Sequence, residues 1–391
     1  MSTAPLLEPW TADEGAAKAR RLFRERFGSE AEVVTLAPGR VNLIGEHTDY
    51  NDGLCLPIAL PHATYAAASA TSDGQVRLTT AGSGEDWEGG AADLATAEGW
   101  AAYVAGVVWA LGEAGHRSPG VDVAVAGCVP AGAGLSSSAA LECSTGLAVL
   151  ETLDAADSPA LRRTLAEAGI RAENEVAGAA TGGMDQTIAV LAEQAHALLL
   201  DCRSWRTEQV PFDPEAAGLR LLVTDTRVHH SLNDGGYASR RADCEQAATQ
   251  LGLPSLREAT LEQLDDLADE RVQARARHVV TEIERVRLTA SALRADDWEE
   301  VGRLMLGSHD SMREDFEISV PELDAVVEVA ARHGALGARM TGGGFGGSAI
   351  WLVPTERADD VSSRIDAHYA SRGWRRPHHL VATASGPARR L

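Results

Sequence analysis

The sequence predicts a mixed α/β protein of two modest domains. Its 391 residues correspond to two or three domains of ordinary size, and a hydrophobic content of 45% is enough for substantial cores. Helical and strand-like patterns follow one another along the chain. Outside the motifs described below, the helix-like runs are 16–27, 101–113, 273–293, 298–312 and 323–333, and the strand-like runs are 64–70, 75–80 and 379–383.

Charge and composition exclude several classes of function. The formal net charge of −22 argues against nucleic acid and anionic membranes as partners, because both require a basic surface. No stretch approaches the roughly 20 apolar residues of a membrane span, and the acidic N-terminal sequence lacks a secretory pattern. We therefore expect a cytoplasmic protein. The five cysteines, an odd number without a CxxC pair, indicate buried thiols rather than disulfides or a zinc site.

The near absence of lysine limits how the chain can bind a nucleotide. Lys18 is the only lysine, and it lies in an arginine-rich helical stretch without a glycine loop. A P-loop needs a lysine before its serine or threonine, and a protein kinase needs a lysine on a strand. Both of these ATP sites are excluded, so any kinase chemistry here would have to depend on backbone amides, a helix N-terminus, Mg²⁺ and arginine.

A dense polar cluster follows the first strand-like run, 32–37. The string APGRVNLIGEHTDYNDG, residues 37–53, brings together Arg40, Glu46, His47 and Asp49. Hydroxyl groups both donate and accept hydrogen bonds, so such paired acceptors and donors suit a polyhydroxylated ligand. Loops also collect Asp, Asn and Gly for turn geometry alone, but the full string is much more specific than a turn.

Residues 121–150 form a second candidate unit. A strand-like run, VDVAVAGCV, leads through the small-residue loop PAGAGLSSS into a helix-like run. Free N–H groups at a helix start bind phosphate, and serine hydroxyls can bind phosphate oxygen or a metal. The alternative is a plain helix cap, for which Ser136 alone would be enough. Three successive serines after GAG favour the nucleotide site.

Three further segments carry candidate residues. In TGGGFGGSAI, residues 341–350, glycines surround Phe345 before a strand-like run; a tight hairpin is the alternative. A helix is expected over 161–176 and carries Glu173, and a small-residue loop then leads to Asp185, which is an N-cap candidate from sequence alone. A strand is expected over 219–226 and a helix from about Gly236, where Tyr237 is either a packing residue or a ligand contact.

The strings 37–53, 129–140 and 341–350 together resemble the three motifs of the GHMP small-molecule kinases, and the first resembles the galactokinase signature of that family. The resemblance covers nearly the whole chain from about Arg20. It implies the two-domain GHMP kinase fold of α/β (α+β) type, with an N-terminal domain over 1–213, a C-terminal domain over 214–391 and the active site in the cleft between them. It also implies a monomer, or a weak dimer.

The resemblance implies ATP-dependent phosphorylation of the anomeric hydroxyl of α-D-galactose to α-D-galactose 1-phosphate, the first committed step of galactose catabolism. ATP is the co-substrate and Mg²⁺ the cofactor, with galactose and ATP as the only partners. Asp185 and Arg40 are then the catalytic residues. The residues implied to bind sugar are Glu46, His47, Thr48, Asp49, Gly182 and Tyr237; those implied to bind ATP are Gly132, Ala133, Gly134, Leu135, Ser136, Ser137 and Ser138; and those implied to bind Mg²⁺ are Ser138 and Glu173.

Two alternatives stay open. A kinase for a related sugar, such as N-acetylgalactosamine or arabinose, would share most of the hydroxyl contacts. Some relatives are regulators that bind sugar and ATP without catalysis; sensors of that kind have a shortened serine loop, whereas GLSSSAA is complete here. The chain departs from the family at Gly183, where isoleucine is common, which is expected to loosen the loop without removing a functional group.

Overall fold

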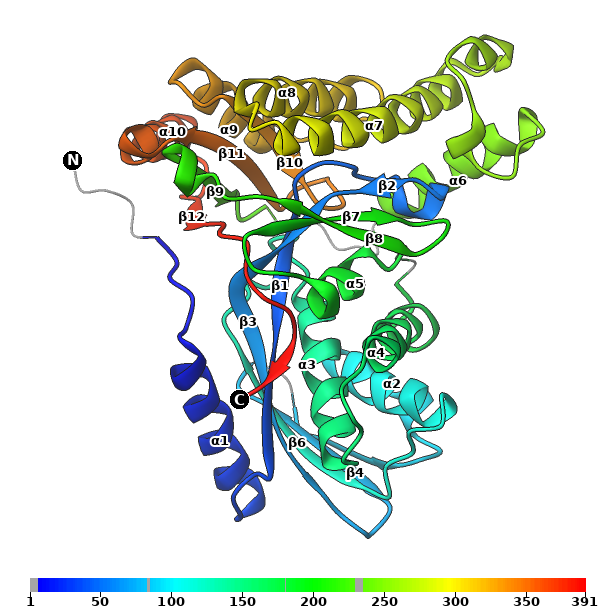
Figure 1. Ribbon diagram of the computed structural model, residues 1–391, viewed down its shortest axis with the longest axis vertical. Coiled ribbons are helices and arrows are strands. Elements are labelled where there is room, and N and C mark those ends of the chain that lie inside the picture. The colour runs from blue at the N-terminus through cyan, green and yellow to red at the C-terminus, as the bar shows by residue number, and fades with distance from the viewer. Residues whose placement is uncertain (1–5, 83–84, 180, 229–234) are drawn as a thin grey trace.

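The computed structural model describes residues 6–82, 85–179, 181–228 and 235–391. Three sheets and the helices around them confirm the expected mixed α/β fold (Figure 1). Among the described helices, none combines the length and the apolar sequence needed to cross a membrane.

The largest sheet has six strands in the order β13-β1-β3-β6-β4-β5. Its described pairs are antiparallel except for β4 with β6. Along β1 and β3 the pairing register shifts between Pro38 and Arg40, and such a bulge redirects the side chain that follows it. The strands are β1 (Val33–Asn42), β3 (Pro57–Ala70), β4 (Gln75–Thr80), β5 (Trp87–Gly90), β6 (Val121–Gly127) and β13 (Arg389–Arg390).

Helices cover both faces of this sheet, which is why every residue of β1 is buried. Helix α1 (Ala12–Phe27) packs on one face through Phe23, against Val34 and Tyr65. Four helices lie toward the other face, and Figure 1 shows them opposite α1. They are α2 (Trp100–Glu113), α3 (Ser137–Thr152), α4 (Pro159–Arg171) and α5 (Met184–Leu191).

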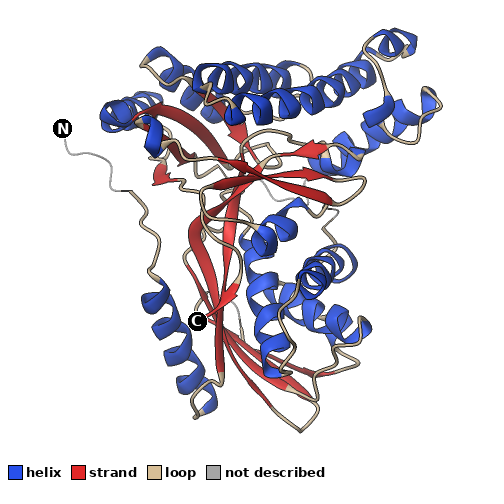
Figure 2. Cartoon of the chain, in the orientation of Figure 1, coloured by secondary structure: helices blue, strands red, loops and turns tan. Residues whose placement is uncertain are grey.

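A four-stranded antiparallel sheet, in the order β10-β11-β9-β12, organises the second half of the chain. Helices α7 to α10 lie above it in Figure 2. Its strands are β9 (Leu219–Asp225), β10 (Gly337–Thr341), β11 (Ser348–Pro354) and β12 (His378–Val381). The helices of this half are α6 (Gly236–Gln250), α7 (Glu270–Arg294), α8 (Trp298–Glu314), α9 (Pro321–Arg332) and α10 (Ala358–Arg372).

A small sheet and a shared core join the two halves. Strands β2 (Leu54–Cys55), β7 (His196–Asp201) and β8 (Arg206–Pro211) form the third sheet. Val41 and Ile58, near one end of the β1–β3 pair, belong to the same hydrophobic cluster as the C-terminal sheet. The loop after β1 is therefore held where the two halves of the molecule meet.

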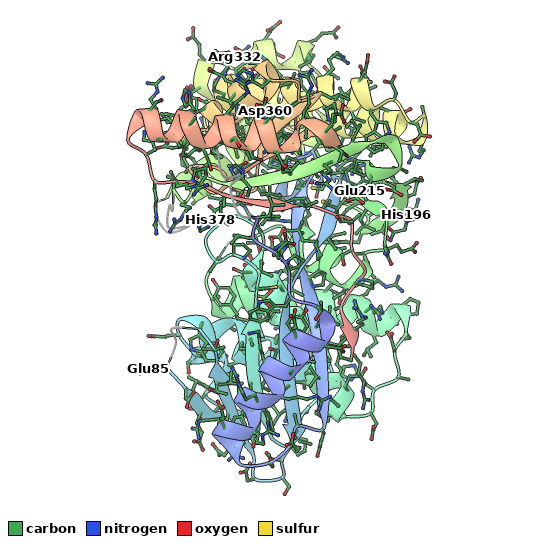
Figure 3. The ribbon with its side chains drawn as sticks, turned by 90° about the vertical axis from the view of Figure 1, so that its left-hand side faces the viewer. Glu85, His196, Glu215, Arg332, Asp360 and His378 are labelled. Carbon is green, nitrogen blue, oxygen red and sulfur yellow. The ribbon has the colours of Figure 1, made fainter. Side chains whose placement is uncertain are left out.

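The two ends of the chain also cross between the halves. Leu6 bridges to β12 in the C-terminal sheet, while β13 pairs with β1 and Leu391 donates its backbone N–H to Val34. In the turned view, Glu85 lies at the left edge of the lower half of the molecule, and Arg332 and Asp360 lie near its top (Figure 3). The last residues of the chain thus pack with the N-terminal sheet.

The helix predicted over 161–176 is present, but its last five residues are π-helical and not α-helical. Helix α4 ends at Arg171, and Ala172–Val176 form a π-helical turn that contains Glu173. In this turn, the backbone N–H of Ala177 donates to the carbonyl of Ala172, five residues earlier. Such turns are rare and frequently occur at functional sites.

One close contact between a helix and a strand gives a test of the fold. A Cβ atom on Gly302 of α8 would lie 2.3 Å from the carbonyl oxygen of Leu336, just before β10. We expect Gly302→Ala to reduce the free energy of unfolding by about 1–3 kcal/mol, because the backbone cannot yield cheaply. Calorimetric melting would measure the change.

Gly307 of the same helix is the matched control. Nothing lies within 4 Å of a Cβ added there, so Gly307→Ala should be neutral or should stabilise by up to about 1 kcal/mol through helix propensity. Equal melting shifts in the two variants would contradict the packing described for α8 and β10.

Candidate active site

Arg40 and Asp185 form a bidentate ion pair where the N-terminal motifs converge. Nε and Nη2 of Arg40 donate to the two carboxylate oxygens of Asp185 at 2.7 and 2.8 Å. The third nitrogen, Nη1, donates to the carbonyl of Gly134 in the serine-rich loop. A planar guanidinium matches a carboxylate in this fork geometry, which a lysine cannot reproduce. The pair is partly buried and aligned by contacts on both sides.

Ser136 connects the serine-rich loop to the same carboxylate. Its hydroxyl donates to Oδ2 of Asp185. It occupies the N-cap position of α3 in a left-handed conformation, φ 56°, and makes no side-chain capping bond. The alternative interpretation of Ser136 as a simple helix cap is therefore wrong. Asp185 is not an N-cap either: Gly183 caps α5, and Asp185 is the second residue of that helix.

The serine-rich loop reaches the start of α3 as predicted. Ser137 and Ser138 are the first two residues of the helix and are half-buried, whereas Ala133 and Leu135 are buried. Gly132 and Gly134 are exposed and take positive φ values of 74° and 71°. The exposed glycines and the free N–H groups of the first helical turn are suited to binding phosphate.

Ser138 and Glu173 lie side by side on the same flank of this loop. Oγ of Ser138 donates to Oε1 of Glu173 at 2.9 Å, and Oε2 accepts from Thr181 at 3.0 Å and from Gln186 at 2.6 Å. Burial, reinforced by the charge of Asp185, raises the pKa of Glu173. A hydroxyl and a carboxylate are hard oxygen donors of the kind that Mg²⁺ prefers.

These two donors fit a magnesium ion that takes its other ligands from phosphate and water. Among the described residues, no group of three or more His, Cys, Asp or Glu side chains is arranged to hold a metal ion. Mg²⁺ usually keeps several waters and binds through one or two carboxylates together with substrate phosphates. Ser138 and Glu173 match that pattern.

Glu46 lies in the loop that follows β1, and its side chain is buried, with the residue only 3% exposed. Oε1 accepts from the backbone N–H of Gly342 at 2.7 Å and from the Thr341 hydroxyl at 3.2 Å, while Oε2 accepts from Asn42 at 2.6 Å and Arg339 at 2.8 Å. Glu46 thus joins the first motif to the third. Burial raises its pKa, and the charge of Arg339 opposes that shift.

His47 is a neutral ring in an aromatic group. Its Nε2 lies 3.1 Å from the carbonyl oxygen of Gly343, which can only accept, so Nε2 carries the proton and Nδ1 accepts from the Tyr50 hydroxyl at 2.7 Å. Burial lowers the pKa of His47 to about 3. Tyr237, from the start of α6, packs 4.9 Å from the His47 ring centroid. The fold thus brings Tyr237 to the site, where its ring packs against that of His47.

Asp49, in the 43–53 loop, lies against Gly182, which precedes α5, and Asp185 is close to Asp49. A Cβ atom on Gly182 would lie 2.1 Å from Oδ2 of Asp49. Burial, with the negative charge of Asp185, raises the pKa of Asp49 to about 6. Thr48 has a different position: it is fully buried, and its hydroxyl donates to the carbonyls of Gly45 and Leu54. Its side chain holds the loop and does not face the other predicted residues.

The third motif packs against both other motifs, as expected from the resemblance. Besides the contacts to Glu46 and His47, the Ser348 hydroxyl donates to the carbonyl of Ala133 at 2.7 Å. A Cβ atom on Gly342 would lie 3.1 Å from the carbonyl oxygen of Gly134. The motif is a set of close backbone contacts and not only a hairpin turn.

Several buried polar residues behind the site are absent from the sequence prediction. Arg339, fully buried, lies 3.6 Å from Glu282, which also accepts from Arg285 at 2.7 Å. Burial would raise the pKa of Glu282, but the charges of Arg285 and Arg339 outweigh it and lower the pKa to about 2. Glu142 and Gln186 lie behind Glu173. The sequence around each of these buried polar residues contains no pattern that would have indicated a function.

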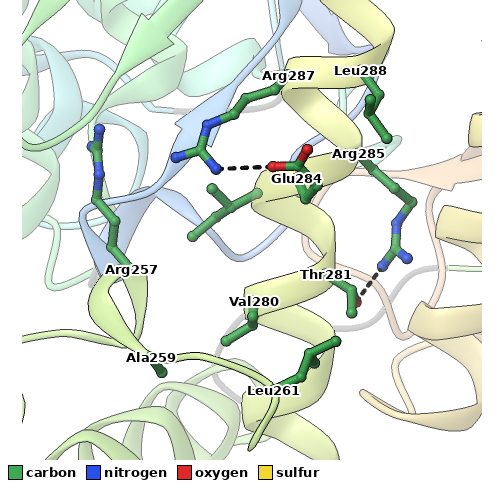
Figure 4. A pocket seen from close by; sticks show the side chains of 10 residues that line it. Arg257, Ala259, Leu261, Val280, Thr281, Glu284, Arg285, Arg287 and Leu288 are labelled. Carbon is green, nitrogen blue, oxygen red and sulfur yellow. Dashed lines mark hydrogen bonds and ion pairs between the residues drawn. The ribbon is translucent and has the colours of Figure 1, made fainter.

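A surface pocket of about 360 Å³ lies elsewhere, between α7 and the 257–261 segment. Figure 4 shows two of its arginines engaged, with Arg287 paired to Glu284 and Arg285 bonded to Thr281. None of the predicted site residues lines it. The candidate active site is instead the meeting point of the three motifs.

Comparison with known proteins agrees with this assignment of motifs. Residues 21–70 match the galactokinase galactose-binding signature, residues 102–193 the GHMP kinase N-terminal domain and residues 289–371 the GHMP kinase C-terminal domain. The chain is 49% identical over 380 residues to a galactokinase of Streptomyces coelicolor, which covers 94% of this chain and 97% of that protein. It is 44% identical over 380 residues to a galactokinase of Homo sapiens, with coverage of 94% and 95%.

Solved structures extend the agreement to three dimensions. A Lactococcus lactis galactokinase complexed with galactose matches with a TM-score of 0.88 at 31% identity, covering 95% of this chain and 98% of that one. The Methanococcus jannaschii mevalonate kinase, with a TM-score of 0.63 at 16% identity and coverage of 90% and 98%, shares the fold alone. Because relatives of this identity span nearly all of its length, the chain belongs to the galactokinase family of the GHMP kinases.

Proposed function

We propose that the protein transfers the γ-phosphoryl group of ATP to the anomeric hydroxyl of α-D-galactose, giving ADP and α-D-galactose 1-phosphate. This reaction opens galactose catabolism. One observation carries the proposal: the Asp185 carboxylate is fixed by Arg40 from the sugar motif and by Ser136 from the ATP loop. These contacts support Asp185 as the acceptor of the hydroxyl proton, between the sugar and the triphosphate.

The sugar is held by the side chains gathered around Asp49 and His47. Asp49 accepts hydrogen bonds from sugar hydroxyls, and Gly182, in contact with it, lets the sugar approach the backbone. Tyr237 and His47 form one aromatic wall. Glu46 precedes His47 in the chain and supports this wall. Each of its carboxylate oxygens already accepts two hydrogen bonds from the protein. A sugar hydroxyl can therefore bind Glu46 only by sharing an oxygen with one of these donors. Thr48 contributes through the loop it holds.

The triphosphate lies along residues 132–138, whose N–H groups and serine hydroxyls contact phosphate oxygens. Ser138 and Glu173 would hold Mg²⁺, which would supply positive charge to stabilise the transferring phosphoryl group. Phosphoryl transfer depends mainly on positioning and on charge stabilisation. Arg40 provides that charge on the sugar side, and Asp185 orients the anomeric hydroxyl and accepts its proton as the new bond forms.

The remaining expectations complete the proposal. The N-terminal domain spans 1–213 and the C-terminal domain 214–391, with the active site between them; the two main sheets, each with its own helices, support this division. The enzyme is cytoplasmic and acts as a monomer or a weak dimer, with galactose and ATP as its partners.

The direct test is ADP release measured with a panel of sugars. We expect turnover with galactose and Mg·ATP, and much weaker turnover with N-acetylgalactosamine and arabinose. A higher kcat/KM for either of these would reassign the substrate. Calorimetric binding of galactose and ATP without ADP release would identify a sensor in place of an enzyme.

Asp185→Asn separates binding from chemistry. The amide keeps the volume of the side chain but loses the charge, so sugar affinity by calorimetry should be retained while kcat falls by a factor on the order of 10² to 10⁴. Asp122→Asn is the control. Asp122 lies on β6 of the six-stranded sheet, away from the site, and is paired with Arg77 on the neighbouring strand β4. Asp185→Asn turnover close to that of Asp122→Asn would remove Asp185 from the chemistry.

The raised pKa of Asp49 predicts a pH dependence of sugar binding. Asp49 is ionised above about pH 6, and an ionised carboxylate accepts hydroxyl hydrogen bonds more strongly than a neutral one. Galactose affinity should therefore decline as the pH falls through about 6, and Asp49→Asn should bind weakly without that decline. Calorimetric titrations between pH 5 and 8 would measure both.

Asp52→Asn is the control for this pH dependence. Asp52 lies on the same loop, is half-buried and is paired with Arg203 at 3.5 Å. It should keep the pH dependence of the unmodified protein. An Asp49→Asn protein with that same decline in affinity would show that another group titrates.

A further inference from the structure

A buried chain of polar side chains lies behind the ATP loop and joins three helical segments. Nε2 of Gln186, on α5, donates to Oε2 of Glu173 at 2.6 Å and to Oε2 of Glu142 at 2.8 Å. Glu173 in turn accepts from Ser138 of α3. Ser138 and Glu142 are four residues apart on α3 and therefore lie on one side of it. The chain runs from Glu142 through Gln186 and Glu173 to Ser138.

Stability alone does not explain why Glu142 is polar. Glu142 and Gln186 are both fully buried, and Oε1 of each has no hydrogen-bond partner among the described residues. Burying polar atoms without partners is costly, and an apolar side chain of the same volume would avoid that cost. Burial, with the nearby charge of Glu173, raises the pKa of Glu142 well above its usual range.

The neighbouring helix leaves room for this arrangement. Gly169 of α4 faces the contact between Gln186 and Glu142: a Cβ atom there would lie 2.9 Å from Cγ of Gln186 and 3.3 Å from Oε2 of Glu142. The absence of a side chain at residue 169 allows the amide to lie between the two carboxyl groups. Glu142 of α3, Glu173 of the π-helical turn and Gly169 of α4 thus together fix the position of the Gln186 amide.

We propose that Glu142 is a positioning residue for the magnesium end of the active site. An amide nitrogen has two hydrogens, and when Glu142 accepts one, the other points at Glu173 Oε2. That bond turns Glu173 so that Oε1 faces Ser138 and the ATP loop. Groups that orient metal ligands in this way change metal affinity when they are removed. The inference rests on the proposed function, because Ser138 and Glu173 hold Mg²⁺ only in that account.

Three variants test the role. Glu142→Leu removes the acceptor, Glu142→Gln restores an acceptor oxygen, and Thr145→Val is the control on the same helix, because Thr145 is fully buried with an unpartnered hydroxyl. The measurement is the Mg²⁺ concentration that half-saturates kcat at saturating galactose and ATP. Melting temperatures and galactose affinity by calorimetry accompany it.

We expect Glu142→Leu to raise the half-saturating Mg²⁺ concentration on the order of 10-fold, while galactose affinity stays unchanged. Glu142→Gln should recover most of that loss, and Thr145→Val should show none. A folded Glu142→Leu protein with an unmoved Mg²⁺ dependence would overturn the proposal, as would an equal shift in Thr145→Val. If Glu142→Leu does not fold, Gly169→Ala, which crowds the same amide, should raise the half-saturating Mg²⁺ concentration in the same direction, and no shift would overturn the proposal.

Binding measurements separate this inference from the proposed function. Calorimetric titration with a non-hydrolysable ATP analogue and Mg²⁺, without sugar, needs no turnover. A protein that binds the analogue but does not phosphorylate galactose would contradict the proposed function, and a weaker Mg²⁺-dependent affinity in Glu142→Leu would still support the positioning role. Equal affinities in Glu142→Leu and the unmodified protein would contradict it.

Discussion

The buried Glu46 carboxylate is the constraint on which the site depends, because it accepts hydrogen bonds from both halves of the molecule. Asn42 binds it from the end of β1, and Arg339, Thr341 and Gly342 bind it from β10 and the motif that follows. Arg339 continues to Glu282 of α7. A buried ion pair is weak support for net stability, but removing one partner costs about 3–5 kcal/mol. The network therefore specifies how the halves fit, and the three motifs meet because of it.

The charges around the site explain why a divalent cation belongs there. Burial is the main cause of the raised pKa of Asp49 and of Glu173, and the nearby charge of Asp185 raises both further. A chain with a net charge of −22 offers no general attraction for a triphosphate. Arg40 balances one carboxylate through its two hydrogen bonds. The carboxylate of Glu173, beside Ser138, is where a bound cation would reduce the repulsion between acidic side chains and phosphate.

Local patterns predicted much of the fold but little of the connection between motifs. The strand 75–80 has the predicted bounds, and the serine-rich loop opens α3 as expected. Strands β7 and β8 were not predicted, because β8 is mostly exposed and does not alternate regularly. Arg339 gives no local signal: it stands 293 residues from Glu46 and is one of 35 basic residues. The resemblance named Arg40 and Asp185 as catalytic residues, but their spacing in the sequence could not show that they form an ion pair. The sequence was also compatible with a capping role for Ser136, but in the structure its hydroxyl donates to Asp185 instead.

The central claim is that the anomeric hydroxyl of galactose meets the Asp185 carboxylate while Arg40 and Ser136 hold it in place. A crystal structure of the protein with galactose, Mg²⁺ and a non-hydrolysable ATP analogue tests it most directly. The account predicts the anomeric oxygen within hydrogen-bond distance of Asp185, the terminal phosphate beyond it along residues 132–138, and the fork between Arg40 and Asp185 intact. A sugar bound with another hydroxyl toward Asp185, or a triphosphate away from the serine-rich loop, would contradict it.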